Sequence, residues 1–146
     1  MKKIKKINKK VILKGGLIID PFENKKYKND IYILNGNIVE ISDFIDIEDA
    51  LTIDCNKKVI TSGFVDIHAH FREPGNENKE TLNSGSLSAM AGGFTDVCIM
   101  PNTLPPIDSP ESIQFILSKA SSLPINIYPI GAITKGQQGR EITEIG

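Results

Sequence analysis

The chain contains two histidines, His68 and His70, which lie two residues apart in the stretch Phe64-Val-Asp-Ile-His-Ala-His-Phe-Arg-Glu-Pro-Gly75. This stretch begins with apolar, β-prone residues and ends at a Pro-Gly pair, so it predicts a strand that runs into a loop. Alternation along a strand predicts one face with Asp66, His68 and His70 and an opposite face with Val65, Ile67 and Ala69. Two imidazoles on one face can bind the same ion, and zinc favours such ligands. We therefore predict that both histidines are metal ligands; the alternative is a pair of buried core histidines held by hydrogen bonds.

Three other polar residues lie near this pair in the predicted fold. Asn102 follows the next apolar run, Phe94–Met100, and the carboxyl ends of neighbouring barrel strands meet at one mouth, so Asn102 is expected beside the histidines. Arg72 lies two residues after His70, so in an extended chain it would be on the same face as His70. The alternatives are a surface ion pair of Arg72 with Glu73 or Glu77, and a simple turn role for Asn102 after Pro101. Asp66 is expected either to orient a histidine or to cap the strand end, and we do not count it as a ligand.

Residues 11–62 contain several short β-branched runs with no helical segment between them. This pattern predicts a small antiparallel sheet or sandwich with a scaffolding role. Val11–Ile19 is expected to form two short strands hinged at Gly15-Gly16, and Asn35-Gly36-Asn37 is typical of a hairpin loop.

From Gly63 onward, strands alternate with helical segments, which predicts parallel βα units. The expected strands are Phe64–His68, Phe94–Met100 and Ile125–Gly131. The expected helices are Lys79–Ala91, a helix that starts at Ser109-Pro110, and a last helix over Glu141–Ile145. In the second of these helices the residues expected to face the core are Ile113, Ile116, Leu117 and Ala120. Three such units are fewer than the eight of a TIM barrel, which needs about 250 residues. The predicted fold class is therefore α/β, with a small N-terminal β-sandwich or sheet (11–62) followed by the first three βα units of an incomplete TIM barrel (63–146).

The composition is that of a soluble globular protein, with 40% hydrophobic and 24% charged residues among 146. No apolar run approaches the ~20 residues that span a membrane, and six lysines in Met1–Lys10 precede no apolar segment of a secretory signal. Residues 1–10 are expected to be a basic, disordered tail, and we expect neither a nucleic-acid nor a membrane partner. Cys55 and Cys98 have no Cys-x-x-Cys spacing, so reduced thiols and a cytoplasmic location are expected.

Four motifs in order resemble the dihydroorotases with a long N-terminal sheet (class I) in the cyclic amidohydrolase superfamily. They are Asp66-Ile-His-Ala-His-Phe-Arg-Glu-Pro-Gly75, Lys79-Glu-Thr81, Ala91-Gly-Gly-Phe-Thr95 and Met100-Pro-Asn-Thr103. The resemblance runs from about Val11 to the last residue and corresponds to the N-terminal portion of the family. Arg-Glu-Pro-Gly is its most discriminating part, because allantoinases and dihydropyrimidinases share the His-x-His but usually lack an arginine at the position of Arg72.

The resemblance implies the reversible, zinc-dependent hydrolysis of (S)-dihydroorotate to N-carbamoyl-L-aspartate in de novo pyrimidine biosynthesis. It implies one or two zinc ions, with His68 and His70 as metal ligands, and substrate binding by His70, Arg72 and Asn102. A guanidinium binds a carboxylate through two parallel hydrogen bonds, which suits Arg72 to these carboxylate-bearing molecules. No catalytic acid or base is assigned in this chain: the proton shuttle, a bridging aspartate or modified lysine, and further histidines are expected downstream of Gly146. We therefore expect that this chain alone binds metal weakly and does not hydrolyse dihydroorotate.

Two other functions fit the same motifs. One is another cyclic amidase, an allantoinase or a hydantoinase. The other is a non-catalytic dihydroorotase-like partner of aspartate transcarbamoylase, although such chains typically lose the metal histidines that this one retains. A homodimer is a further possible assembly.

Overall fold

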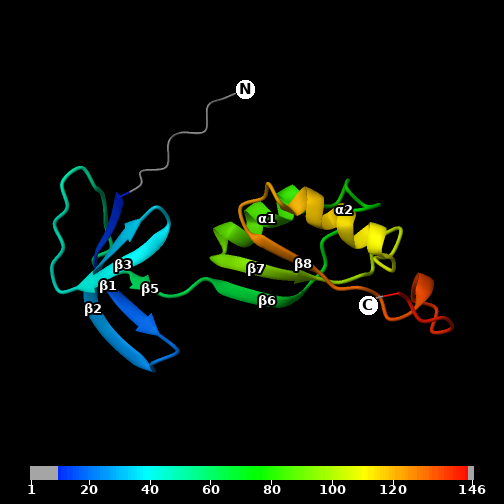
Figure 1. The fold of residues 1–146 in the computed structure, drawn as a ribbon, viewed down its shortest axis with the longest axis horizontal. Coiled ribbons are helices and arrows are strands. Elements are labelled where there is room, and N and C mark those ends of the chain that lie inside the picture. The colour runs from blue at the N-terminus through cyan, green and yellow to red at the C-terminus, as the bar shows by residue number, and fades with distance from the viewer. Residues whose placement is uncertain (1–9, 145–146) are drawn as a thin grey trace. The chain divides into compact units, whose positions relative to one another are not determined.

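The computed structural model describes residues 10–144, which divide into a unit that ends at Ser62 and a second unit that begins at Gly63 (Figure 1). The predicted basic tail lies outside the described residues, except for Lys10, which is the first residue of a strand.

The first unit is a mixed sheet of five strands. The strands are β1 (Lys10–Asp20), β2 (Lys25–Leu34), β3 (Asn37–Ser42), β4 (Leu51–Asp54) and β5 (Val59–Ile60). β2 lies between β1 and β3 and is antiparallel to both, whereas β4 and β5 pair with β1 in parallel. The expectation of an antiparallel sheet is therefore wrong for β4 and β5, because the connection over residues 43–50 returns the chain to the start of β1 before β4 begins.

Glycine and asparagine residues set the bends of this sheet. The predicted hinge at Gly15-Gly16 does not divide β1 into two strands; the strand continues with a shift of register between Leu13 and Gly16. Gly15 has a φ of +70°, which is the left-handed conformation that a bulge of this kind requires. The predicted hairpin between β2 and β3 is confirmed, with positive φ at Asn35 and Gly36.

The buried carboxylate of Asp30 connects this bulge to the segment after β3. Its side chain accepts hydrogen bonds from the backbone N–H of Gly15 (2.8 Å) and from that of Ile45 (3.0 Å), and Lys14 Nζ lies 3.9 Å from it. Asp30 is only 3% exposed, so these donors replace the water that the carboxylate loses on folding.

The second unit is a three-stranded parallel sheet with helices on one face (Figure 1). Its elements are β6 (Phe64–Ala69), α1 (Leu82–Ala91), β7 (Phe94–Ile99), α2 (Pro110–Ala120), β8 (Asn126–Pro129) and the 3₁₀ turn η1 (Lys135–Gln137). The strand order is β6-β7-β8, and both pairings are parallel. The prediction of a mixed α/β fold with parallel βα units is confirmed.

The core of this unit lies between the sheet and the two helices. Its buried members are Phe71, Leu82, Val97, Ile99, Ile107, Ile116, Ile125 and Ile127. Within the predicted stripe of α2, Ile116 is fully buried and Ile113 and Ala120 pack against the core, but Leu117 is exposed. Cys98 lies between Val97 and Ile99 in β7 and therefore points to the opposite face of the sheet.

Local capping sequences decide where the helices begin. α2 begins as predicted, with Ser109 as the N-cap, Pro110 in the first turn and a capping box to Ser112. α1 begins at Leu82 rather than Lys79, because the Thr81 side chain caps the backbone N–H of Ser84.

The predicted last helix is wrong for residues 141–144, and Ile145 lies outside the described residues. Thr143 N–H donates to the Ile133 carbonyl (3.0 Å), and Thr134 and Ile142 form an isolated antiparallel bridge. These backbone groups pair across the loop after β8, so they are not available for helical hydrogen bonds. Over residues 10–144, no helix is both long enough and apolar enough to cross a membrane.

Replacing Asp30 with alanine should destabilise the first unit by about 2–4 kcal/mol, because two backbone N–H groups and Lys14 lose a buried partner. Urea unfolding followed by the amide signals of β1 and β2 measures this loss. The matched control is Asp46→Ala, which removes an exposed carboxylate of the same unit and should change stability by less than about 0.5 kcal/mol. Equal effects of the two substitutions would contradict the role given to Asp30.

Candidate functional site

Strand β6 contains a bulge just before the histidines. Asp66 pairs with Val97 and Ala69 pairs with Ile99, so three steps along β6 correspond to two steps along β7. Val97 and Ile99 face the helices, and residues paired in a parallel sheet share a face, so Asp66 and Ala69 face the helices as well. The predicted alternation, with Asp66 on the face of His68 and His70, is therefore wrong.

The side chain of Asp66 has a local role in this bulge. Its Oδ1 accepts a hydrogen bond from the backbone N–H of His68 at 2.9 Å. Of the two roles expected for Asp66, the structure shows a contact with the backbone and none with an imidazole ring.

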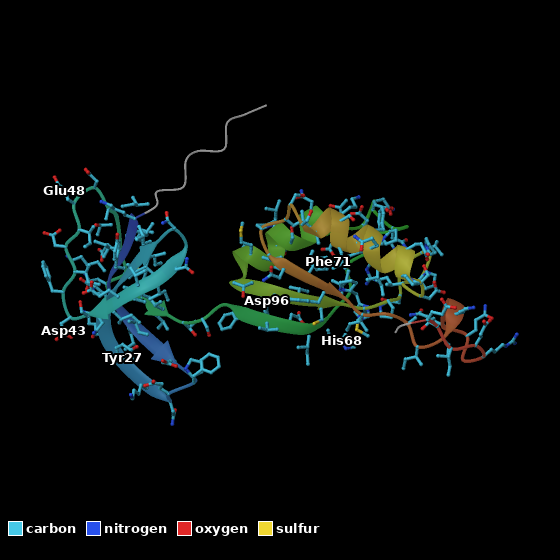
Figure 2. All side chains as sticks on the ribbon, in the orientation of Figure 1. Tyr27, Asp43, Glu48, His68, Phe71 and Asp96 are labelled. Carbon is cyan, nitrogen blue, oxygen red and sulfur yellow. The ribbon has the colours of Figure 1, made fainter. Side chains whose placement is uncertain are left out.

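His68, labelled in Figure 2, and His70 are close to each other at the carboxyl end of β6. Both side chains are exposed, their ring centroids lie 5.1 Å apart, and the rings are inclined by 61°. The alternative of buried core histidines is therefore wrong. The structure brings the two rings together at the surface of the second unit.

Asn102 lies beside His70, as the sequence predicts. His70 Nδ1 and Asn102 Oδ1 are 2.8 Å apart, although the residues are 32 positions apart in the chain. The Met100 N–H also donates to the Ala69 carbonyl at 2.9 Å, so the ends of β6 and β7 are joined just before the two loops diverge. With Asn102 Oδ1 as the acceptor, Nδ1 of His70 carries the proton and the Nε2 lone pair is free for another ligand.

Arg72 is exposed in the loop after β6. Within residues 10–144 its side chain forms no ion pair, so the alternative of a pair with Glu73 or Glu77 is not what the structure shows. Glu73 is instead paired with Lys119, and Glu77 accepts a hydrogen bond from the backbone N–H of Gly75 at 2.9 Å. Among the described residues, the guanidinium is thus free of carboxylate partners.

The imidazole pair has a spacing that a metal ion requires. Two imidazoles bound to one tetrahedral zinc at about 2.0–2.1 Å have ring centroids about 5 Å apart, and the observed separation is 5.1 Å. A fixed Nδ1 on His70 also matches the usual arrangement of metal-binding histidines, in which the second ring nitrogen is held by a hydrogen bond. No group of three or more His, Cys, Asp or Glu side chains within residues 10–144 is arranged to hold a metal ion. The described residues therefore fit as part of a metal site, with two ligands.

A second polar cluster lies on the face of the sheet away from the helices. Asp96 on β7 (labelled in Figure 2) accepts hydrogen bonds from Thr95 Oγ1 (2.6 Å), Asn126 Nδ2 (2.9 Å) and Tyr128 OH (3.1 Å). The Thr95 hydroxyl, then the Asn126 amide, and then the Tyr128 hydroxyl hold the pKa of the Asp96 carboxyl below its ordinary value. The same contact with Asp96 raises the pKa of Tyr128.

Known structures share the fold of this chain. An L-hydantoinase (dihydropyrimidinase) from Arthrobacter aurescens matches with a TM-score of 0.75 and 27% identity, over 85% of this chain and 28% of that one. The parallel βα units, together with paired histidines at the end of their first strand, define a protein of the amidohydrolase class.

The sequence relatives are more specific. The dihydroorotase of Caldanaerobacter subterraneus subsp. tengcongensis is 46% identical over 137 residues, and that of Aquifex aeolicus is 43% identical over 136 residues. These alignments cover 93% and 92% of this chain but 32% of each relative, so the chain spans about a third of their length. The family model described as dihydro-orotase-like matches residues 57–146. The chain belongs to the dihydroorotase-like family.

Two features of this region were missed by the sequence reasoning. Asp96 is the one charged residue within an apolar strand, Phe94–Ile99, and that pattern was a usable signal for a polar contact on the open face. Glu73 is buried and pairs with Lys119, 46 positions away, and no local pattern indicates that partner.

The depressed pKa of Asp96 should make this cluster sensitive to acid. The pKa of the Asp96 carboxyl is lower in the folded chain than in the unfolded chain, where it is about 3.9. The ionised carboxyl therefore stabilises the fold at pH values above about 3.9, and this stabilisation is lost as the pH falls through the folded-state pKa. Thr95→Val removes the largest cause and should raise the pKa of Asp96, measured by ¹³C carboxyl shifts over a pH titration. Ser121→Ala removes a hydroxyl from the end of α2 and should leave that titration unchanged. An unaltered Asp96 titration in Thr95→Val would contradict the assignment.

Proposed function

We propose that this chain supplies two metal ligands and a substrate-carboxylate site of a dihydroorotase, which hydrolyses (S)-dihydroorotate reversibly to N-carbamoyl-L-aspartate in pyrimidine biosynthesis. The observation that carries this proposal is the contact of His70 with Asn102, together with an exposed Arg72 that forms no ion pair within residues 10–144. It is supported by dihydroorotases at 46% and 43% identity.

Each residue has a separate task in this proposal. His68 and His70 bind the metal through the ring nitrogens left free, and Asn102 fixes the orientation of His70. When bound, a zinc ion supplies Lewis-acid polarisation of the ring amide and activation of water. Arg72 binds the carboxylate of dihydroorotate through paired hydrogen bonds, and the Asn102 side-chain amide donates to the same carboxylate. The family resemblance also assigns His70 a contact with the substrate.

The remaining parts of the site are expected outside the described residues. A catalytic zinc usually has three protein ligands, and a two-metal site has more, whereas two imidazoles are described here. We propose that the second unit is the start of a TIM barrel, since the carboxyl ends of β6 and β7 carry the candidate residues, as in barrel enzymes. The proton acceptor is expected from the same later part of the barrel.

A cytoplasmic location stays a prediction from the two cysteines, and assembly as a homodimer or with aspartate transcarbamoylase stays a prediction from the resemblance. A hydantoinase function is the second candidate, because the Arthrobacter aurescens protein is an L-hydantoinase with a TM-score of 0.75. Arg72 separates the two, since a hydantoin or dihydrouracil ring carries no carboxylate for a guanidinium to bind.

Zinc binding tests the two ligands directly on this chain. We expect the 146-residue chain to bind zinc weakly in a calorimetric titration, and His68→Ala or His70→Ala to abolish that binding. Asn102→Leu should weaken it by about 10-fold or more, because His70 loses the group that orients it. Asp66→Asn is the matched control: its side chain faces the helices, so zinc affinity should be unchanged. A loss in Asp66→Asn equal to that in the histidine variants would contradict this geometry.

Activity requires the rest of the catalytic domain, which a chimera can supply. We expect this chain, fused to the later two-thirds of the Caldanaerobacter dihydroorotase in place of its own first third, to hydrolyse dihydroorotate. Arg72→Gln should lower kcat/KM for dihydroorotate by roughly 10- to 100-fold, the equivalent of a lost charged hydrogen bond.

Dihydrouracil is the discriminating second substrate for that chimera. If the protein is a dihydroorotase, dihydrouracil is hydrolysed poorly and Arg72→Gln does not reduce its turnover further. A folded chimera that prefers dihydrouracil, with or without Arg72, would support the hydantoinase alternative and contradict the proposal.

A further inference from the structure

Glu73 is the residue after Arg72, and the two side chains have opposite environments. The Arg72 side chain is exposed, whereas Glu73 is 4% exposed. A carboxylate this deeply buried is destabilising unless charged or polar groups surround it. Its partners therefore indicate what this buried carboxylate does.

The Glu73 carboxylate bridges the two helices of the second unit. Oε2 accepts a hydrogen bond from the backbone N–H of Leu82, the first residue of α1, at 2.8 Å. Oε1 forms an ion pair with Lys119, which lies in the last turn of α2. A negative charge is favourable at a helix N-terminus, so the contact with α1 is electrostatic as well as directional.

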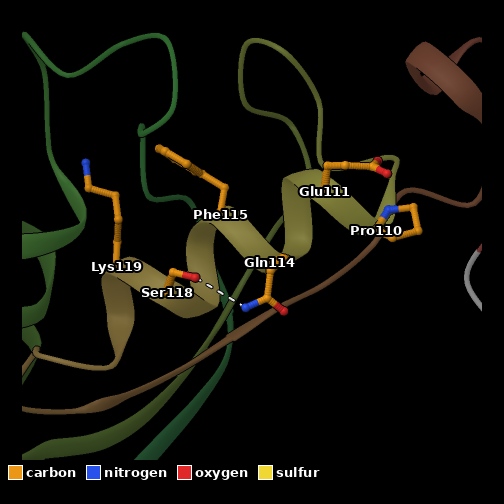
Figure 3. A pocket seen from close by; sticks show the side chains of 6 residues that line it. All are labelled: Pro110, Glu111, Gln114, Phe115, Ser118 and Lys119. Carbon is orange, nitrogen blue, oxygen red and sulfur yellow. Dashed lines mark hydrogen bonds between the residues drawn. The ribbon is translucent and has the colours of Figure 1, made fainter.

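Lys119 is held in place for this contact. It projects from the same side of α2 as Phe115 (Figure 3), and its Nζ lies 5.3 Å from the centre of that ring. The side chain is half exposed, so it can be replaced without leaving a cavity in the core.

The loop residues on either side of Arg72 are fixed by other contacts. Phe71 packs against Gly85 of α1, where a Cβ would lie 2.9 Å from the ring. The Pro74 carbonyl accepts from the Leu104 N–H at 3.0 Å, and Gly75 has a φ of +99° and lies against the Leu104 backbone. The backbone around Arg72 is thus held on both sides, while the guanidinium extends to solvent without a protein carboxylate.

We infer that Glu73, through its ion pair with Lys119, is a positioning residue that holds the Arg72 loop in the geometry for binding a substrate carboxylate next to Asn102. The inference rests on the proposed function for Arg72, and Glu73 itself does not touch the substrate. A guanidinium on a fixed loop loses less freedom when it binds a carboxylate, and a displacement of about 1 Å is enough to impair two parallel hydrogen bonds.

Loop order and ligand affinity in the 146-residue chain test this inference together. The variants are Glu73→Gln, which removes the charge, and Lys119→Gln, which removes the partner from a half-exposed position and so is the milder change. The matched control is Glu111→Gln, which removes an exposed carboxylate from the first turn of the same α2. Amide spectra confirm that each variant is folded.

The first readout is the ¹H–¹⁵N heteronuclear NOE of residues 71–76 other than Pro74, which has no amide hydrogen. It should fall in Glu73→Gln and Lys119→Gln, while the values of β7 and α1 stay unchanged and Glu111→Gln matches the original chain. Unchanged order of residues 71–76 in both folded variants overturns the inference, whether or not any ligand binds.

The second readout is the dissociation constant of N-carbamoyl-L-aspartate, measured by amide shift changes, in a double-mutant cycle with Arg72→Gln. Glu73→Gln alone should raise the constant by about five- to tenfold, and it should have no further effect once Arg72 is glutamine. Additive effects would mean that Glu73 acts independently of Arg72, which overturns the inference. If the original chain does not bind this probe although the variants lose loop order, the substrate assignment fails and the positioning of the loop stands.

Discussion

The hydrogen bond between His70 and Asn102 is the contact on which the rest of the candidate site depends. It joins a loop that follows β6 to a loop that follows β7, and the sheet pairing just before it brings the two loops within reach. The parallel order of β6 and β7 places both carboxyl ends at one edge, so the distance of 32 residues in sequence becomes 2.8 Å in space. Without this contact the His70 ring could rotate and present either nitrogen, and its spacing from His68 would not indicate that both rings can bind one metal ion.

Buried carboxylates play the same structural part in both units. Asp30 in the first unit and Glu73 in the second each accept a backbone N–H from a distant segment and lie near a lysine. A carboxylate has two oxygens and can therefore fix two segments at once, which an apolar contact cannot do with the same directionality. In the second unit the carboxylate belongs to the loop that carries Arg72, so the same kind of contact that stabilises the fold also lies next to a candidate site residue.

Local signals in the sequence were sufficient for most of the strands and helices. Ser109-Pro110 predicted the start of α2, and Asn35-Gly36 predicted the hairpin of β2 and β3, because capping and turn conformations depend on adjacent residues. Several of the errors involve partners that are not adjacent in sequence. β4 pairs with β1 in parallel, residues 142–143 pair with residues 133–134, and Glu73 pairs with Lys119. The start of α1 was misplaced for a local reason, the cap formed by Thr81. Periodicity contains no information about non-local partners: it placed His68 and His70 at the end of a strand, whereas the substrate-binding roles of Arg72 and Asn102 rest on the family resemblance and stay predictions.

The bulge in β6 shows how one such non-local feature determines the chemistry of the site. In a regular strand Asp66 would share a face with His68 and His70 and would bring a carboxylate toward any bound ion. The extra residue opposite β7 turns Asp66 toward the helices, where its carboxylate accepts the backbone N–H of His68 instead. The end of β6 and the loops after β6 and β7 carry two imidazoles, one amide and one guanidinium, with no ion pair to Arg72 within residues 10–144. Under the proposed function this set suits an anionic ligand, because no carboxylate among the described residues is paired with the guanidinium.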